Sequence, residues 1–178
     1  TKVGYNFVGW YNGEAQVSAE ATYTFAATED CTLTAKFTKN TYTVTVTPGE
    51  NGTVTGAGEY ELGASVTLTA TPNEGYNFVG WFDEDGNQVK EITRGSTGDI
   101  NLTAKWEAVK YLVTFIVDGA EYSSSEVAYD SVIVLPEDPT KAQDDKYTYI
   151  FKEWVGYTDG MTVTGKMEFS AKFEEILR

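Results

Sequence analysis

The heptapeptide Gly-Tyr-Asn-Phe-Val-Gly-Trp occurs at residues 4–10 and again at residues 75–81. A looser copy, Tyr-Ile-Phe-Lys-Glu-Trp at 149–154, keeps the Tyr, the Phe and the Trp in the same relative places. Each copy of this motif is followed by a second string: Leu-Thr-Ala-Lys-Phe at 33–37, Leu-Thr-Ala-Lys-Trp at 102–106 and Phe-Ser-Ala-Lys-Phe at 169–173. Self-similarity over a domain-sized period indicates a tandem array. We therefore expect a partial repeat at 1–39 and complete repeats at 40–107 and 108–178.

The residues between these strings have the composition and alternation of β-strands. Residues 41–47 and 111–117 take the same place in the second and third repeats, and both are rich in β-branched or aromatic residues. Asn12-Gly13 and Asp118-Gly119 favour tight hairpin turns. One short helix, near 140–146 with Thr140 as its N-cap, is the only plausible helix. The sequence therefore predicts a mainly β fold, or a β-rich α+β fold, built of small units.

Side-chain parity divides the two strings into faces, because successive strand residues point to opposite sides of a sheet. One parity forms the expected core: Phe7, Phe78 and Phe151 in the motif, and Phe37, Trp106 and Phe173 in the second string. The motif Trp residues lie on the other parity. Either a bulge at Gly9 and Gly80 turns these rings back into the core, or the rings cap a strand end while half exposed.

Composition excludes several functions. The formal net charge of −14, from 27 acidic and 13 basic residues, repels phosphate and so disfavours nucleic acid. The chain has no His, which excludes a His-dependent triad and a His metal site. Its single Cys31 cannot form an internal disulfide and is expected to be a buried or half-buried strand residue. No apolar run is long enough for membrane insertion. We expect no catalytic residue and no cofactor.

Aromatic residues are the main candidates for binding. Stacking platforms for sugars, or anchors for a protein partner, could be formed by Trp10, Tyr11, Trp81, Phe82 and Trp154. The competing and favoured interpretation is that the motif aromatics are core.

Two charged patterns have a functional and a structural interpretation. Asp83, Asp85 and Asn87 alternate like the first ligands of a calcium loop, but the loop lacks the following Gly and the distal Glu, which favours a solvated turn and no metal site. Lys36, Lys105 and Lys172 recur in the second string, where a cross-link between a strand Lys and an Asn or Asp is conceivable. Their parity favours ordinary surface lysines that discourage strand aggregation.

The order of a Thr/Val strand, a Gly-rich turn, Gly-Tyr-x-Phe-x-Gly-Trp and Leu-Thr-Ala-Lys-Phe/Trp resembles the internalin B-type repeats, also called Listeria–Bacteroides repeats. Residues 1–107 resemble the divergent branch, and residues 110–173, with Asp138-Pro139-Thr140-Lys141, resemble the ordinary branch. The resemblance implies small β-grasp-like units strung in tandem on bacterial surface proteins. Glu153 departs from the pattern, because it replaces the second Gly of the motif.

These observations predict a non-catalytic, extracellular segment at the cell surface or cell wall, acting as a stalk and in adhesion to a host or bacterial surface protein. The alternative is an accessory carbohydrate-binding module, whose partner would be a glycan. Because the chain starts inside a repeat, we expect a fragment of a longer secreted protein. The half-repeat would leave sheet edges exposed, so pairing between chains is a further expectation.

Overall fold

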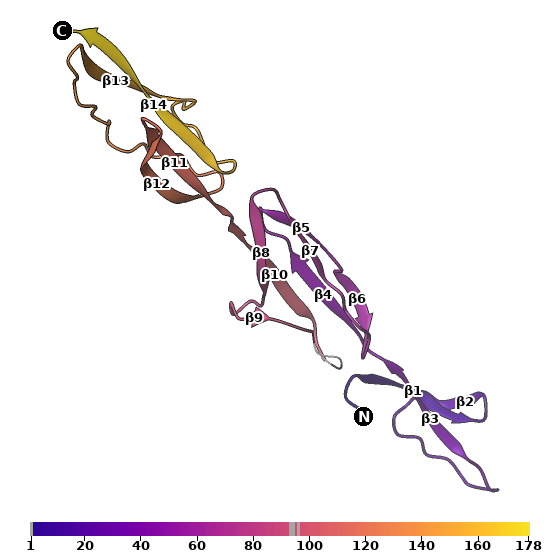
Figure 1. Cartoon of the computed structure of the whole chain (residues 1–178). Coiled ribbons are helices and arrows are strands. Elements are labelled where there is room, and N and C mark those ends of the chain that lie inside the picture. The colour runs from indigo at the N-terminus through magenta and orange to yellow at the C-terminus, as the bar shows by residue number, and fades with distance from the viewer. Residues whose placement is uncertain (1, 93–94, 96) are drawn as a thin grey trace. The chain divides into compact units, whose positions relative to one another are not determined.

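The computed structural model describes residues 2–92, 95 and 97–178. Within these residues it holds fourteen β-strands and no helix (Figure 1). The mainly β fold is confirmed, whereas the short helix near 140–146 is wrong. Residues 136–144 have no regular secondary structure, and the Asp144 carboxylate accepts hydrogen bonds from the backbone N–H groups of Lys146 and Tyr147 instead.

The third repeat shows the complete sheet plan, in the order β12-β11-β14-β13. Its strands are β11 (Lys110–Val117), β12 (Ala120–Ala128), β13 (Tyr147–Val155) and β14 (Met167–Leu177). The central strands β11 and β14 are parallel, and each outer strand pairs antiparallel with its neighbour. The β11–β12 hairpin turns at Asp118 and Gly119, whose φ angles of 50° and 82° suit a type I′ turn. This is a grasp-like mixed sheet without a helix.

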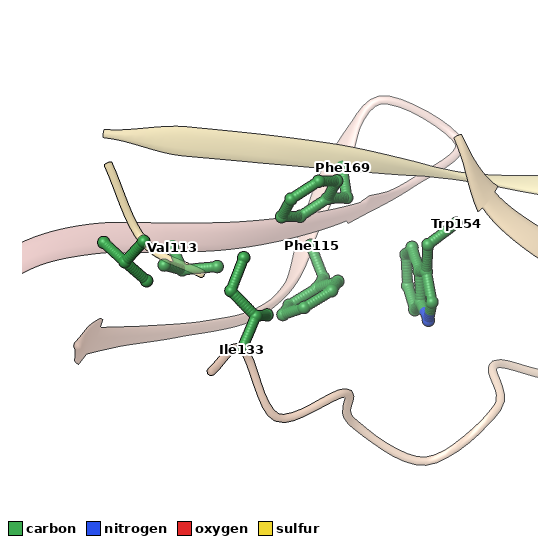
Figure 2. Packing of buried hydrophobic residues seen from close by; sticks show 6 residues of the cluster. Val113, Phe115, Ile133, Trp154 and Phe169 are labelled. Atoms are coloured by element: carbon green, nitrogen blue, oxygen red, sulfur yellow. The ribbon is translucent and has the colours of Figure 1, made fainter. Parts of the chain in front are cut away.

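The core of this repeat covers one face of the sheet (Figure 2). Its buried members are Val113, Phe115, Ile133, Trp154, Val163 and Phe169. Ile133 and Val163 come from two loops that hydrogen-bond to each other, through Ile133 N–H to the Met161 carbonyl and Val163 N–H to the Ser131 carbonyl, both 3.0 Å. These paired loops cover the sheet in place of a helix.

The second repeat has a five-stranded sheet, in the order β6-β4-β10-β8-β9, and a two-stranded sheet of β5 and β7. Its strands are β4 (Thr41–Thr47), β5 (Gly52–Thr55), β6 (Gly58–Glu61), β7 (Thr69–Pro72), β8 (Tyr76–Phe82), β9 (Gln88–Val89) and β10 (Ile100–Ala108). Its central strands β4 and β10 are parallel, like β11 and β14. Its buried hydrophobic residues, among those described, are Val44, Leu102 and Ala104.

The first repeat forms one small sheet. Its three strands, in the order β2-β1-β3, are β1 (Tyr5–Asn12), β2 (Ala15–Ser18) and β3 (Leu33–Lys39). They correspond to β9-β8-β10 of the second repeat. Cys31 lies in the loop before β3 and is exposed, so the expectation of a buried strand residue is wrong.

The motif strand carries a β-bulge in the first and third repeats. Phe7 pairs with Phe37 but Gly9 pairs with Lys36, so Val8 is the extra residue. The third repeat shows the same shift between Phe151 and Glu153. An extra residue reverses side-chain parity, which places Trp10 opposite Ala35 and Trp154 opposite Ala171. A bulge is thus present in the first and third repeats, and Glu153 does not prevent it. The Trp154 ring is buried, whereas the Trp10 ring stays half-buried.

The second Gly of the motif makes room for a glutamine. Gln16 Nε2 donates to the Val8 carbonyl at 3.0 Å, and Gln88 Nε2 donates to the Val79 carbonyl at 3.1 Å. A Cβ on Gly9 would lie 2.4 Å from Gln16 Nε2, and one on Gly80 would lie 2.3 Å from Gln88 Nε2. Both glutamines come from the strand after the motif hairpin. In the described part of the third repeat no strand takes that place, so Glu153 has space for its side chain.

The residues expected in the core form cross-strand aromatic pairs. The ring centroids of Phe7–Phe37, Phe78–Trp106 and Phe151–Phe173 are 5.5, 5.4 and 5.9 Å apart, in edge-to-face geometry. Five of these six residues are half-buried. Phe37 is 43% exposed, so its assignment to the core is wrong. The half-unit supplies Phe7 on one side of this ring and leaves the other side to solvent.

Contacts divide the chain into two compact units, Thr1–Thr71 with Val79–Lys105, and Pro72–Phe78 with Trp106–Arg178. These units differ from the sequence repeats, because the start of β8 and the end of β10 group with the third repeat.

Candidate functional site

Trp154 lies in the hydrophobic core. It is 4% exposed, and its ring packs against Phe115 with centroids 4.9 Å apart and against Phe151 at 5.4 Å (Figure 2). The bulge in β13 causes this inward placement. An indole enclosed in this way has no free face for a sugar or a protein partner, so Trp154 does not act as the binding platform considered from the sequence.

Tyr11 and Phe82 each directly follow a motif Trp, and each ring makes a cation–π contact with a lysine. Lys36 Nζ lies 4.1 Å from the Tyr11 ring centroid, and Lys105 Nζ lies 4.1 Å from the Phe82 ring centroid. Cation–π contacts of this kind are worth about 0.5–1 kcal/mol at exposed sites. In the third repeat Val155 replaces the aromatic residue, and Lys172 binds Glu153 at 2.8 Å instead. One face of each ring is therefore already occupied.

The same lysines were the cross-link candidates. Lys36 lies 3.7 Å from the Glu14 carboxylate in addition to its contact with Tyr11. The hydrogen bond to Glu153 raises the pKa of Lys172, which keeps that amine protonated. A protonated amine is not a nucleophile. These contacts are those of surface lysines, and the absence of a cross-link stays a prediction for intact-mass measurement.

Trp10 is half-buried at the base of a loop. Its indole N–H donates to the Ala21 carbonyl at 3.3 Å. The same loop carries a stacked aromatic pair, Tyr23 and Phe25, with centroids 5.3 Å apart and an angle of 14° between the rings. Phe25 is 44% exposed, and the pair lines a hollow of about 150 Å³. This pair is not among the binding candidates derived from the sequence, although the Tyr-Thr-Phe alternation at 23–25 is a signal for it.

Trp81 lines a cavity of about 310 Å³. The other apolar side chains around this cavity are those of Val66, Leu68, Val89, Ile92 and Leu102. Leu102 takes the place of Phe169, and its parallel partner Val46 takes the place of Phe115. The second repeat therefore has smaller side chains where the third repeat has two rings beside its Trp.

The calcium candidates form a hydrogen-bonded turn. Asp83 accepts from the Asn87 backbone N–H at 2.7 Å and from Asn87 Nδ2 at 3.2 Å. The backbone hydrogen bond from Asn87 is the main cause that holds the pKa of Asp83 below its ordinary value. Asp83 and Asn87 thus bind each other, and Asp85 is exposed on the turn. No group of three or more His, Cys, Asp or Glu side chains in the described residues could hold a metal ion.

The recurring sheet, motif strand and aromatic pair define a tandem array of small β-repeats. The family model of the Listeria–Bacteroides repeat domain matches residues 1–36 and 111–175, and that of the divergent InlB B-repeat domain matches residues 42–110. The chain belongs to the Listeria–Bacteroides repeat family, whose repeats occur in bacterial surface proteins such as internalins. The partial first repeat, assigned above to the divergent branch, matches the ordinary repeat instead.

Three relatives share this segment. A putative membrane protein of Evansella cellulosilytica is 35% identical over 144 residues, which cover 79% of this chain and 22% of that protein. A putative Gly-rich membrane protein of the same organism is 32% identical over 185 residues, which cover 97% of this chain and 21% of that protein. Internalin H of Listeria monocytogenes is 32% identical over 105 residues, which cover 57% of this chain and 18% of that protein. The chain thus spans about a fifth of the length of these curated relatives. No solved structure matches it.

Proposed function

We propose that this chain is a non-catalytic spacer segment of a bacterial cell-surface protein, outside the cell, and that it holds another part of that protein away from the surface. The observation that carries the proposal is the reuse of one packing plan in all three repeats. The same cross-strand aromatic pair recurs with centroids 5.5, 5.4 and 5.9 Å apart. Most motif aromatics therefore serve packing, as expected of a repeated scaffold.

Membership of a repeat family found in bacterial surface proteins supports this proposal. The names of the relatives, two putative membrane proteins and an internalin, agree with a surface or membrane-associated setting. Among the described residues there is no helix with the length and apolar character needed to span a bilayer. We propose that adhesive contacts, where the chain makes them, are to a host or bacterial surface protein.

A carbohydrate-binding role is the second candidate, and one observation favours it. The stacked pair of Tyr23 and Phe25 beside a hollow of about 150 Å³ is the kind of concave aromatic surface on which sugars bind. This role would make the chain an accessory module of a secreted or surface enzyme.

Affinity electrophoresis through gels that contain cell-wall and plant polysaccharides, together with a glycan array, separates the two candidates. The spacer predicts no retention and no array signal above a control protein of equal charge. Retention that disappears in a Tyr23→Ala/Phe25→Ala variant, but persists in a Val134→Ala variant, would overturn the spacer in favour of carbohydrate binding. Val134 is a suitable control because it is 84% exposed and lies outside both cavities.

A further inference from the structure

The first Gly of the motif sits in the same turn in two repeats. Tyr5 N–H donates to the Lys2 carbonyl at 3.1 Å, and Tyr76 N–H donates to the Asn73 carbonyl at 3.2 Å. The third residue of each turn is the motif Gly, Gly4 or Gly75, with φ of 79° and 80°. A positive φ at this position is the mark of a type II turn and favours glycine. Backbone conformation is thus one reason for this Gly.

A chain of two hydrogen bonds then leads from each Gly into the following repeat. The Gly75 carbonyl accepts from Val109 N–H, and the Val109 carbonyl accepts from Tyr129 N–H, both at 2.8 Å. Val109 is the single residue between β10 and β11. The backbone N–H and the backbone carbonyl of Val109 are therefore both hydrogen-bonded, the N–H to the motif Gly and the carbonyl to the residue after β12.

The first junction repeats this pattern with different side chains. Asn40 is the single residue between β3 and β4, and its N–H donates to the Gly4 carbonyl at 2.9 Å. Its own carbonyl accepts from Leu62 N–H, also at 2.9 Å. Leu62 directly follows β6, as Tyr129 directly follows β12. Two junctions with unrelated linker residues have the same geometry, so the geometry belongs to the repeat.

The side chain of the residue after β6 or β12 lies against the motif Gly. A Cβ on Gly75 would lie 2.2 Å from Cγ of Tyr129, and a Cβ on Gly4 would lie 2.6 Å from Cδ2 of Leu62. The Tyr129 ring also packs edge-on against Tyr76, with centroids 5.8 Å apart. Space is thus a second and independent reason for glycine at this position.

We propose that the first Gly of the motif forms a joint between consecutive repeats. The Gly is the seat of this joint, which means the site against which a side chain of the next repeat packs. The partner that fits this seat is the next copy of the repeat, which inserts the large side chain that directly follows its β6 or β12 strand. The two backbone hydrogen bonds of the linker residue then hold the two copies in a fixed arrangement. The third repeat has Thr148 in place of this Gly, and Thr148 pairs with Ile176 inside the sheet. A repeat that followed the third one would need a different junction.

Amide hydrogen exchange, followed residue by residue by NMR in the whole chain, tests the joint. Gly75→Asn is the informative variant, because Asn tolerates a positive φ but brings a Cβ into the Tyr129 ring. Gly86→Asn is the matched control, since Gly86 has φ of 83° and no atom within 4 Å of a Cβ. We expect Gly75→Asn to speed exchange of the Val109 and Tyr129 amides at least about tenfold, with the Val113 and Phe115 amides unchanged. The control should leave all four rates within about twofold.

Unchanged exchange at Val109 and Tyr129 in Gly75→Asn would overturn the joint, and so would an equal acceleration in Gly86→Asn. If Gly75→Asn does not fold, Tyr129→Ala supplies the answer. It removes the ring without adding an atom at the seat, so it should speed the exchange of Val109 alone at least about fivefold. No acceleration would count against the joint. The joint deepens the spacer proposal, but its test is separate, because exchange rates at Val109 do not depend on whether the chain retains polysaccharides.

Discussion

Phe115 stacks on Phe169 across the two central parallel strands of the third repeat, with ring centroids 5.5 Å apart. The second repeat has Val46 and Leu102 in the equivalent parallel pair, and a cavity of about 310 Å³ lies beside Leu102 and Trp81. The two complete repeats therefore have the same pair of central parallel strands, each in its own sheet. They differ in how completely side chains fill the space beside the motif Trp. Packing density predicts a difference in stability between them.

Leu102→Phe should stabilise the second repeat. The added ring would fill part of the cavity with the side chain that the third repeat uses at this position. Cavity-filling changes commonly add about 0.5–2 kcal/mol. Urea denaturation monitored by NMR signals of the second repeat checks this. A loss of stability would show that the cavity cannot accept the ring.

Phe115→Ala should destabilise the third repeat by about 3–5 kcal/mol, because truncating a buried Phe removes its transfer free energy and leaves a cavity. Phe115 is 3% exposed and contacts both Trp154 and Phe169. Val134→Ala is the control, with an expected change within about 0.5 kcal/mol, since Val134 is 84% exposed. Chemical denaturation followed by tryptophan fluorescence measures both. Equal effects of the two variants would contradict the assigned core.

Gly9→Ala should destabilise the first repeat, because the new Cβ would collide with the Gln16 amide over the bulge. Replacing Gln16 as well, in Gly9→Ala/Gln16→Ala, should recover part of this loss. A double-mutant cycle isolates the coupling, for which we expect about 0.5–1.5 kcal/mol, the usual range for one hydrogen bond and its close contact. Strict additivity of the two substitutions would mean that Gln16 is not the reason for the Gly.

Stability should depend on pH through Asp144 and Tyr149, whose Oδ2 and hydroxyl oxygen are 2.5 Å apart. The Tyr149 hydroxyl donates to Asp144, which lowers the pKa of Asp144 below its ordinary 3.8 and raises the pKa of Tyr149 to about 12 from 10.0. The contribution of Asp144 is therefore present above pH 3.8 and is lost as the pH falls through its lowered pKa. The contribution of Tyr149 is present below pH 10.0 and is lost as the pH rises towards about 12.

Tyr149→Phe isolates this pair from the other titrating groups. The difference in unfolding midpoint between parent and variant should be constant from about pH 5 to 9 and should shrink at both extremes. Denaturation series at stepped pH measure that difference. A difference that stays constant up to pH 12 would contradict the hydrogen bond.

Much of the fold could be predicted because the determining signals are local. The alternation at Thr41–Thr47 and the turn at Asp118-Gly119 depend on neighbouring residues only, and the structure has both where they were predicted. The segment 132–135, Val-Ile-Val-Leu, has the composition of a strand but forms a single bridge, from Val132 to Thr162. Its partner is another loop, and no local pattern encodes that pairing.

The two motif glycines show what the sequence could not supply. Their recurrence was plain, but the reasons for Gly4 and Gly9 are side chains distant in the sequence or across a hairpin, Leu62 and Gln16. The burial of Trp154 likewise depends on a bulge that parity alone could not choose. Long-range packing therefore decided which motif residues are scaffold and which remain candidates for binding.

Single-molecule FRET on the whole chain tests whether the repeats form a spacer with fixed joints. Dyes would be placed at Glu14→Cys and Ala120→Cys, which are exposed positions in the first and third repeats, with the exposed Cys31 changed to Ser. We predict one narrow distance distribution that broadens in Gly4→Asn/Gly75→Asn and stays narrow in Gly86→Asn. A broad distribution in the chain with unchanged glycines, or no broadening in Gly4→Asn/Gly75→Asn, would show that the repeats do not form a jointed spacer.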